Sequence, residues 1–166
     1  MATSSFKDWL AEQHKKQPSE AERARKLDEW LNALESLYGQ LYAWLREDDH
    51  EEVVKTWRDS EAIEEEELGI YSAPSLRFVL RGKTVIAKPV ARNVIGPGRS
   101  GGPIGPIHPV RGEGRVDLKG SDGLFHLYRV RDVENKLHWV IMDQDQLTYK
   151  ELDKAAFQDA LRRLFS

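Results

Sequence analysis

The sequence predicts an α+β protein. An N-terminal helical unit precedes an antiparallel β-meander, forming a curved sheet or a small open barrel, and a C-terminal helix covers it. Three observations support this fold class. Apolar residues recur at helical spacing up to residue 59, the apolar period becomes two after residue 73, and a helical pattern returns near the end of the chain. Covering one apolar sheet face with a helix is an economical way to build a single core.

The two halves of the chain carry opposite charge. Residues 1–69 contain 18 acidic and 9 basic side chains, a net charge of −9. Residues 70–166 contain 16 basic and 10 acidic side chains, a net charge of +6. We therefore expect two domains, an acidic helical unit over 1–69 and a basic β-meander with its C-terminal helix over 70–166.

The first helices have recognisable start signals. Ser5 can cap a short helix that carries Phe6, Trp9 and Leu10 on one side. A second helix is expected from Ser19, because a glutamate three residues later completes the spacing of a capping box.

This second helix carries an apolar stripe with a seven-residue repeat over about three heptads. The stripe and candidate self-association residues are Leu27, Leu31, Leu34, Tyr38, Leu41 and Leu45. The stripe fits packing on another helix of the same chain, and a homodimeric coiled coil or bundle is the alternative. Gly39 lies within it and lowers helix propensity, which we interpret as a sign of close helix approach.

The segment before residue 70 is strongly acidic. A further short helix is expected from residue 48 and carries Trp57. Glu61 and residues 64–67 then form an acidic block, which we interpret as a solvated helix face ended by Gly69. The alternative is an acidic strap that lies on the basic half through individually weak contacts.

Five or six short strands and one helix are expected after residue 73. The strand candidates are 76–80, 84–87, 90–95, 114–119, 124–130 and 136–142. Glycine-rich or Asp/Asn-containing turns join several of them. Thr148 and Glu151 stand at capping-box spacing, so the final amphipathic helix is expected to start there.

Basic side chains gather in the first strands and in a glycine- and proline-rich segment, 96–113, which we expect to be a long loop. The candidate anion- or partner-binding residues are Arg77, Arg81, Arg92, Arg99, Arg111 and Arg115. Guanidinium groups beside glycine amides can hold an anion, but the solvent face of an antiparallel sheet is polar in any case. Aromatic platforms for base stacking are missing from 79–124, which disfavours binding of single-stranded nucleic acid.

The sequence offers no catalytic motif. Residues 96–101 match G-x-G-x-x-G, but the prolines that follow prevent the helix that a dinucleotide site needs. The histidines lack metal-ligand spacing, so we expect no metal and no cofactor. An enzyme would require His108, His126, Glu113 or Asp117 to converge with the loop arginines.

The leading hypothesis is a non-enzymatic protein-interaction module. Its helical half would serve self-association or docking on another protein, and its basic β half would bind an acidic partner. Binding of nucleic acid or a phosphate ligand by the basic surface is the alternative, and an enzyme of unknown class is the second alternative. The chain has no membrane-length apolar run, no cysteine and no visible secretory signal, so we expect a cytoplasmic protein with no membrane partner. The stripe from Leu27 to Leu45 makes a homodimer a further expected partner.

Overall fold

The computed structural model describes residues 4–99, 107–146 and 148–166. The helices are α1 (Phe6–Lys16), α2 (Glu20–Asp48) and α3 (Lys154–Phe165). The strands are β1 (Lys55–Glu65), β2 (Gly69–Leu80), β3 (Lys83–Ala91), β4 (Val94–Arg99), β5 (Ile107–Gly112), β6 (Arg115–Lys119), β7 (Leu124–Arg131), β8 (Leu137–Asp143) and β9 (Tyr149–Glu151).

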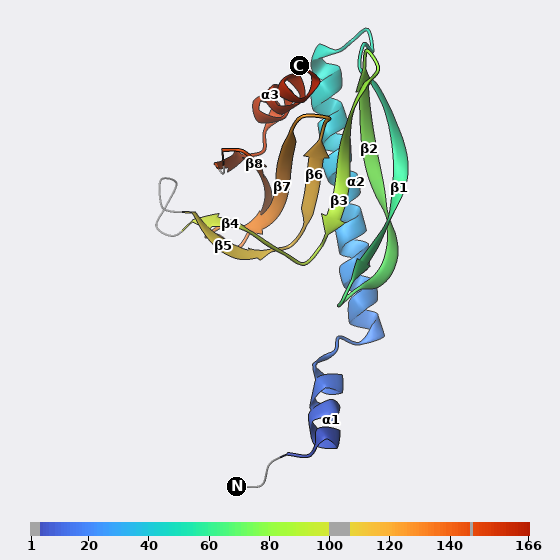
Figure 1. Cartoon of the computed structure of the whole chain (residues 1–166), viewed down its shortest axis with the longest axis vertical. Helices are drawn as coiled ribbons and strands as arrows, with labels where there is room; N and C mark the ends of the chain where they lie inside the picture. The colour runs from blue at the N-terminus through green and yellow to red at the C-terminus, as the bar shows by residue number, and fades with distance from the viewer. Residues whose placement is uncertain (1–3, 100–106, 147) are drawn as a thin grey trace.

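Seven of these strands form one open antiparallel sheet in the order β1-β2-β3-β6-β7-β8-β9. The order follows the chain except for β4 and β5, which pair with each other as a separate two-stranded arm between β3 and β6. The predicted α+β fold with a meander sheet is therefore confirmed, and the sheet is open and curved (Figure 1).

The helix α2 runs along one face of this sheet, and α3 packs near the C-terminal end of α2 (Figure 1). Fully buried side chains from α2, the sheet and α3 form the core, among them Trp30 and Leu34 of α2, Phe78 of β2 and Phe157 of α3. The backbone at Gly114, just before β6, lies very close to α2. A Cβ atom added at Gly114 would lie 2.2 Å from Cζ3 of Trp30, so only glycine leaves room for this indole.

Two predicted helix starts have different outcomes. The hydroxyl of Ser19 accepts a hydrogen bond from the backbone N–H of Glu22 at 3.2 Å, as expected for the start of α2. The last helix is confirmed as α3, but its predicted start is wrong, because Thr148 lies before β9 and α3 begins after Asp153. The Asp153 carboxylate accepts the Ala156 N–H at 2.7 Å and thus caps the helix at this later position.

The prediction of helix through residue 59 is also wrong. Residues 55–65 form β1, which pairs with β2 from Lys55 opposite Val79 to Glu65 opposite Gly69. The acidic block therefore lies at the end of a hairpin rather than on a helix face. Pairing with a complete neighbouring strand overrides the helix propensity of the many glutamates.

The expected boundary after residue 69 falls at the turn of this β1–β2 hairpin. Buried residues from α2, the sheet and α3 belong to one hydrophobic cluster, so the acidic and basic halves share a core. In the described part of the chain, no helix is long and apolar enough to cross a bilayer.

Candidate functional site

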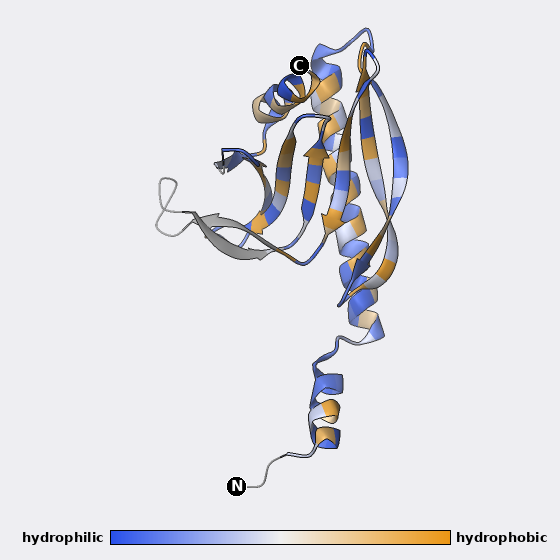
Figure 2. Cartoon of the chain, viewed as in Figure 1, coloured by the Kyte–Doolittle hydropathy of each residue, from blue (hydrophilic) through white to orange (hydrophobic). Residues whose placement is uncertain are grey.

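The helix α1 presents an apolar face that the rest of the described chain leaves uncovered. Phe6, Trp9 and Leu10 are 73%, 49% and 48% exposed, and the helix has no buried residue. The rings of Phe6 and Trp9 stack on each other with centroids 5.6 Å apart. Figure 2 shows the apolar part of α1 well away from the sheet.

Local signals define both ends of α1. The Ser5 hydroxyl accepts the Asp8 N–H at 3.2 Å while the Asp8 carboxylate accepts the Ser5 N–H at 3.3 Å, which is a complete capping box. Gln17 ends the helix in an extended conformation before Pro18. An isolated helix of 11 residues is marginal in water, so α1 has most to gain from packing on another surface.

The predicted self-association stripe on α2 is used by the chain's own core. Leu34, Tyr38 and Leu41 are fully buried, Leu45 is 7% exposed, and they pack with residues of the sheet. Leu27 and Leu31 are partly buried against the same cluster. The stripe thus packs inside the chain, in one cluster with residues of the sheet and of α3. Gly39 marks no close approach, since a Cβ atom there would meet nothing within 4 Å.

Several of the predicted anion-binding arginines form ion pairs within the chain. Nε of Arg77 lies 3.1 Å from the Asp59 carboxylate. The Arg115 guanidinium donates two hydrogen bonds to Asp117, at 2.8 and 2.9 Å. These contacts neutralise two of the predicted anion-binding arginines within the chain.

Arg92 is buried and belongs to an ion-pair cluster that joins α2 to the sheet. Its guanidinium lies 3.4 Å from Glu29, and Arg129 of β7 donates a hydrogen bond to the other oxygen of the same carboxylate at 2.5 Å. Burial alone would raise the pKa of Glu29, but Arg129 and Arg92 outweigh it and hold that pKa below its usual range. The cluster is therefore an internal connection rather than a free anion site.

The acidic residues at the end of the β1–β2 hairpin contact the start of the basic half. The buried Glu65 carboxylate accepts the backbone N–H groups of Arg92 and Asn93, each at 3.0 Å, as well as the Tyr71 hydroxyl. Glu67 accepts a hydrogen bond from the Asn93 side chain at 2.6 Å. This arrangement resembles the strap that was the alternative interpretation of the acidic block.

The remaining arginines do not form one patch. Arg81 is exposed in the β2–β3 turn, where its φ is 51°. The nine-residue strand β3 separates it from Arg92, a distance of about 30 Å along an extended chain. The side chains of Arg99 and Arg111 lie outside the part of the chain that the structure describes. The expected long loop that carries them is largely the β4–β5 arm.

Arg115, Asp117 and His126 meet on the sheet. The sequence suggested Arg115 for the basic surface and the other two for the enzyme alternative. His126 is 5% exposed, and its Nδ1 lies 2.7 Å from Asp117, which also binds Arg115. Burial would raise the pKa of Asp117, but hydrogen bonds from His126 and Arg115 lower it, so Asp117 is an ionised acceptor and Nδ1 carries the proton. Nε2 of His126 contacts the Gln144 side chain. Glu113 lies apart, paired with Arg131 at 2.8 Å, and the side chain of His108 is not described.

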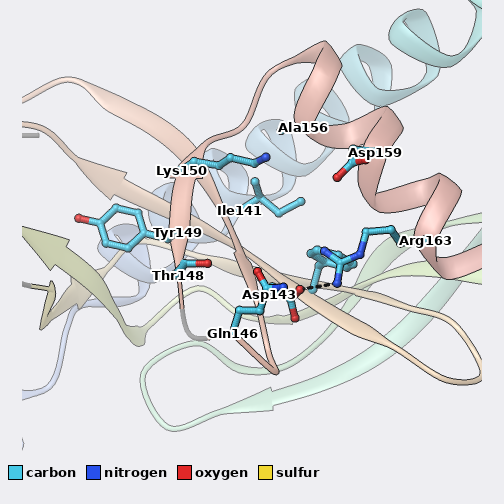
Figure 3. Close-up of a pocket in the computed structure, with 10 residues that line it drawn as sticks. Ile141, Asp143, Gln146, Thr148, Tyr149, Lys150, Ala156, Asp159 and Arg163 are labelled. Atoms are coloured by element: carbon cyan, nitrogen blue, oxygen red, sulfur yellow. Dashed lines mark ion pairs between the residues drawn. The ribbon is translucent and has the colours of Figure 1, made fainter. Parts of the chain in front are cut away.

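A cavity of about 170 Å³ lies elsewhere, between the β8–β9 segment and α3 (Figure 3). Ile141, Phe125 and Ala156 contribute apolar lining, and the ion pair between Asp143 and Arg163, 2.7 Å long, borders it. None of Arg115, Asp117 and His126 lines this cavity.

No protein-family model matches the chain, and no curated protein or solved structure is significantly similar to it.

Sequence patterns revealed only part of these sites. The α1 face was visible as a local helical spacing behind a cap. The Glu29, Arg92 and Arg129 cluster was missed, because its members are far apart in sequence and no local pattern links them.

Proposed function

We propose that this chain is a non-enzymatic protein-interaction module that docks on a partner protein through the apolar face of α1. The observation that carries the proposal is the exposed set of Phe6, Trp9 and Leu10 on a capped helix with no buried residue. Anchors at positions i, i+3 and i+4 are typical of a helix that binds in an apolar groove. Aromatic anchors of this kind supply much of the binding energy of an interface.

The basic half contributes a second contact in this proposal. Arg81 is exposed in the β2–β3 turn, so an acidic surface on the partner would meet it there. Binding of nucleic acid or a phosphate ligand has less support, because Arg77 and Arg115 are engaged by carboxylates. A cytoplasmic location remains part of the proposal, consistent with a chain that has no cysteine to oxidise.

Site-specific photocrosslinking in cells tests the docking helix. A photoreactive amino acid replaces Leu10 in one variant and Val133 in a matched control. Val133 is also apolar and is 97% exposed, but it lies in the β7–β8 turn. We expect a discrete crosslinked product from position 10 that position 133 does not give.

The specificity of that product is checked by changing the rest of the α1 face. In the position 10 variant, Phe6→Ser and Trp9→Ser should abolish the product, because they remove the two stacked anchors. Identical products from both positions, or a product that survives both substitutions, would show that α1 is not the docking element.

A further inference from the structure

The strand β1 is an unpaired edge of the large sheet. It pairs with β2 on one side and with no described strand on the other, and its first half is outermost in Figure 1, near the label β1. It is 11 residues long, whereas β9 at the opposite edge has 3. A long edge strand exposes a row of backbone N–H and C=O groups that another strand can pair with. Trp57, 47% exposed, lies in this edge strand.

We propose that two copies of the chain associate edge to edge through β1, with the strands antiparallel and the two-fold axis passing beside Trp57. This surface is independent of α1. A symmetric antiparallel pair needs a two-fold axis perpendicular to the sheet, so each residue lies opposite a residue on the same face. In a register centred on one residue, that residue lies opposite its own copy. The residues at equal distances before and after it then lie opposite each other across the interface.

Charge excludes nearly every register. A centre on a charged residue puts that residue opposite its own copy, which excludes Arg58, Asp59, Glu61, Glu64 and Glu65. A centre on Ser60 puts Asp59 opposite Glu61. Directly opposed like charges destabilise a pair of strands.

The centres on Ala62, Ile63 and Lys55 also place like charges opposite each other. A centre on Ala62 puts Asp59 opposite Glu65, and a centre on Ile63 puts Glu61 opposite Glu65. A centre on Lys55 opposes two lysines. Only the centres on Thr56 and Trp57 place no like charges opposite each other.

The register centred on Trp57 also gains attractive contacts. It places Lys55 of each copy opposite Asp59 of the other, and it brings the two Trp57 rings together at the axis. Arg58 pairs with Glu35 of α2 at 2.9 Å, so its neighbours Trp57 and Asp59 project from the opposite face of the strand, away from that helix. Opposite charges and aromatic pairs at directly facing positions stabilise sheets. The centre on Thr56 offers no opposite-charge pair, so the Trp57 register is favoured.

A charge-swap experiment tests this register. The molar mass of the full chain is measured by light scattering over a range of concentrations for the unchanged protein, Lys55→Asp, Asp59→Lys and the double variant. Each single reversal creates two like-charge contacts in the dimer, and we expect it to raise the dimer dissociation constant at least about tenfold. The double variant restores both opposite-charge contacts between the copies, although Asp59→Lys also loses the ion pair with Arg77 of its own chain. It should therefore dimerise more tightly than either single variant.

Controls separate the interface from the fold and from α1. Lys136→Asp reverses a lysine in the β7–β8 turn and should leave the dissociation constant unchanged, as should Phe6→Ser with Trp9→Ser. Circular dichroism checks that every variant is folded. Hydrogen exchange at the amides of residues 55–59 should slow as protein concentration rises. A chain that stays monomeric throughout, single reversals without effect, a double variant as weak as the singles, or a dimer lost with the α1 substitutions would each overturn the proposal.

Discussion

The substitution Glu29→Gln is expected to weaken the attachment of α2 to the sheet. The Glu29 carboxylate receives Arg92 and Arg129, whose side chains are only 8% and 10% exposed. Glutamine keeps the shape of the side chain but removes its charge. Both guanidinium groups then lose a charged partner, and for Arg129 that carboxylate is its ion-pair partner in the described part of the chain.

The expected size follows from burial. Removing one partner of a fully buried ion pair costs about 3–5 kcal/mol, but Glu29 is 42% exposed and water compensates for part of the loss. We therefore expect Glu29→Gln to lower the free energy of unfolding by about 2 kcal/mol. Glu35→Gln on the same helix is the matched control. Glu35 is 57% exposed and pairs with a half-exposed Arg58, so its loss should cost less than about 0.5 kcal/mol.

The effect should depend on pH in a defined direction. The pKa of Glu29 is lowered in the folded chain, so its stabilising contribution is fully present above the pKa of an unfolded glutamate. The contribution is lost as the pH falls through the lowered folded-state pKa. The difference between the unchanged protein and Glu29→Gln should therefore shrink in acid, since glutamine does not titrate.

Urea unfolding followed by tryptophan fluorescence and circular dichroism measures these free energies. Equal losses for Glu29→Gln and Glu35→Gln would refute the reasoning, because the burial of the two arginines would then have no energetic consequence. A difference that grows in acid would also refute it, because the sign of the pKa shift would be wrong.

Three further substitutions are checked by the same unfolding assay. Gly39→Ala should raise the free energy of unfolding by up to about 1 kcal/mol, because the added methyl group meets no atom within 4 Å and alanine favours helix; a loss would contradict the open surroundings. Gly114→Ala should lower it by at least about 2 kcal/mol, because its Cβ would overlap the buried Trp30 ring, and a neutral result would contradict this contact. Asp153→Ala should lower it by about 1 kcal/mol through loss of the α3 cap, and no change would show that the cap forms without the carboxylate.

Local patterns predicted the elements whose own sequence decides their structure. Leu76, Phe78 and Leu80 recur at every second position of residues 76–80, and this segment lies within β2. Arg81 and Gly82 form the turn that joins β2 to β3, both with positive φ, as favoured in a tight hairpin. The cap at Ser19 likewise needs only its neighbours.

Elements that depend on distant partners could not be predicted in this way. Residues 55–65 are rich in glutamate and become a strand because β2 pairs with them along their whole length. Glu65 is buried because it accepts N–H groups from Arg92 and Asn93, which follow 27 and 28 residues later.

The same limit applies to the candidate site. The apolar spacing of Phe6, Trp9 and Leu10 was visible in the sequence, but only the structure places them outside the core. The stripe from Leu27 to Leu45 has a similar spacing and packs on the sheet. Sequence periodicity identifies an apolar face, whereas the surface that covers this face depends on the tertiary fold.

The most direct test of the proposed docking helix is the stability of a chain in which Phe6, Trp9 and Leu10 are all serine. If α1 is free for a partner in the isolated protein, the free energy of unfolding should change by less than about 0.5 kcal/mol, as for exposed surface sites. A loss of several kcal/mol would mean that these side chains pack within the chain, and the α1 face would then not be available to a partner.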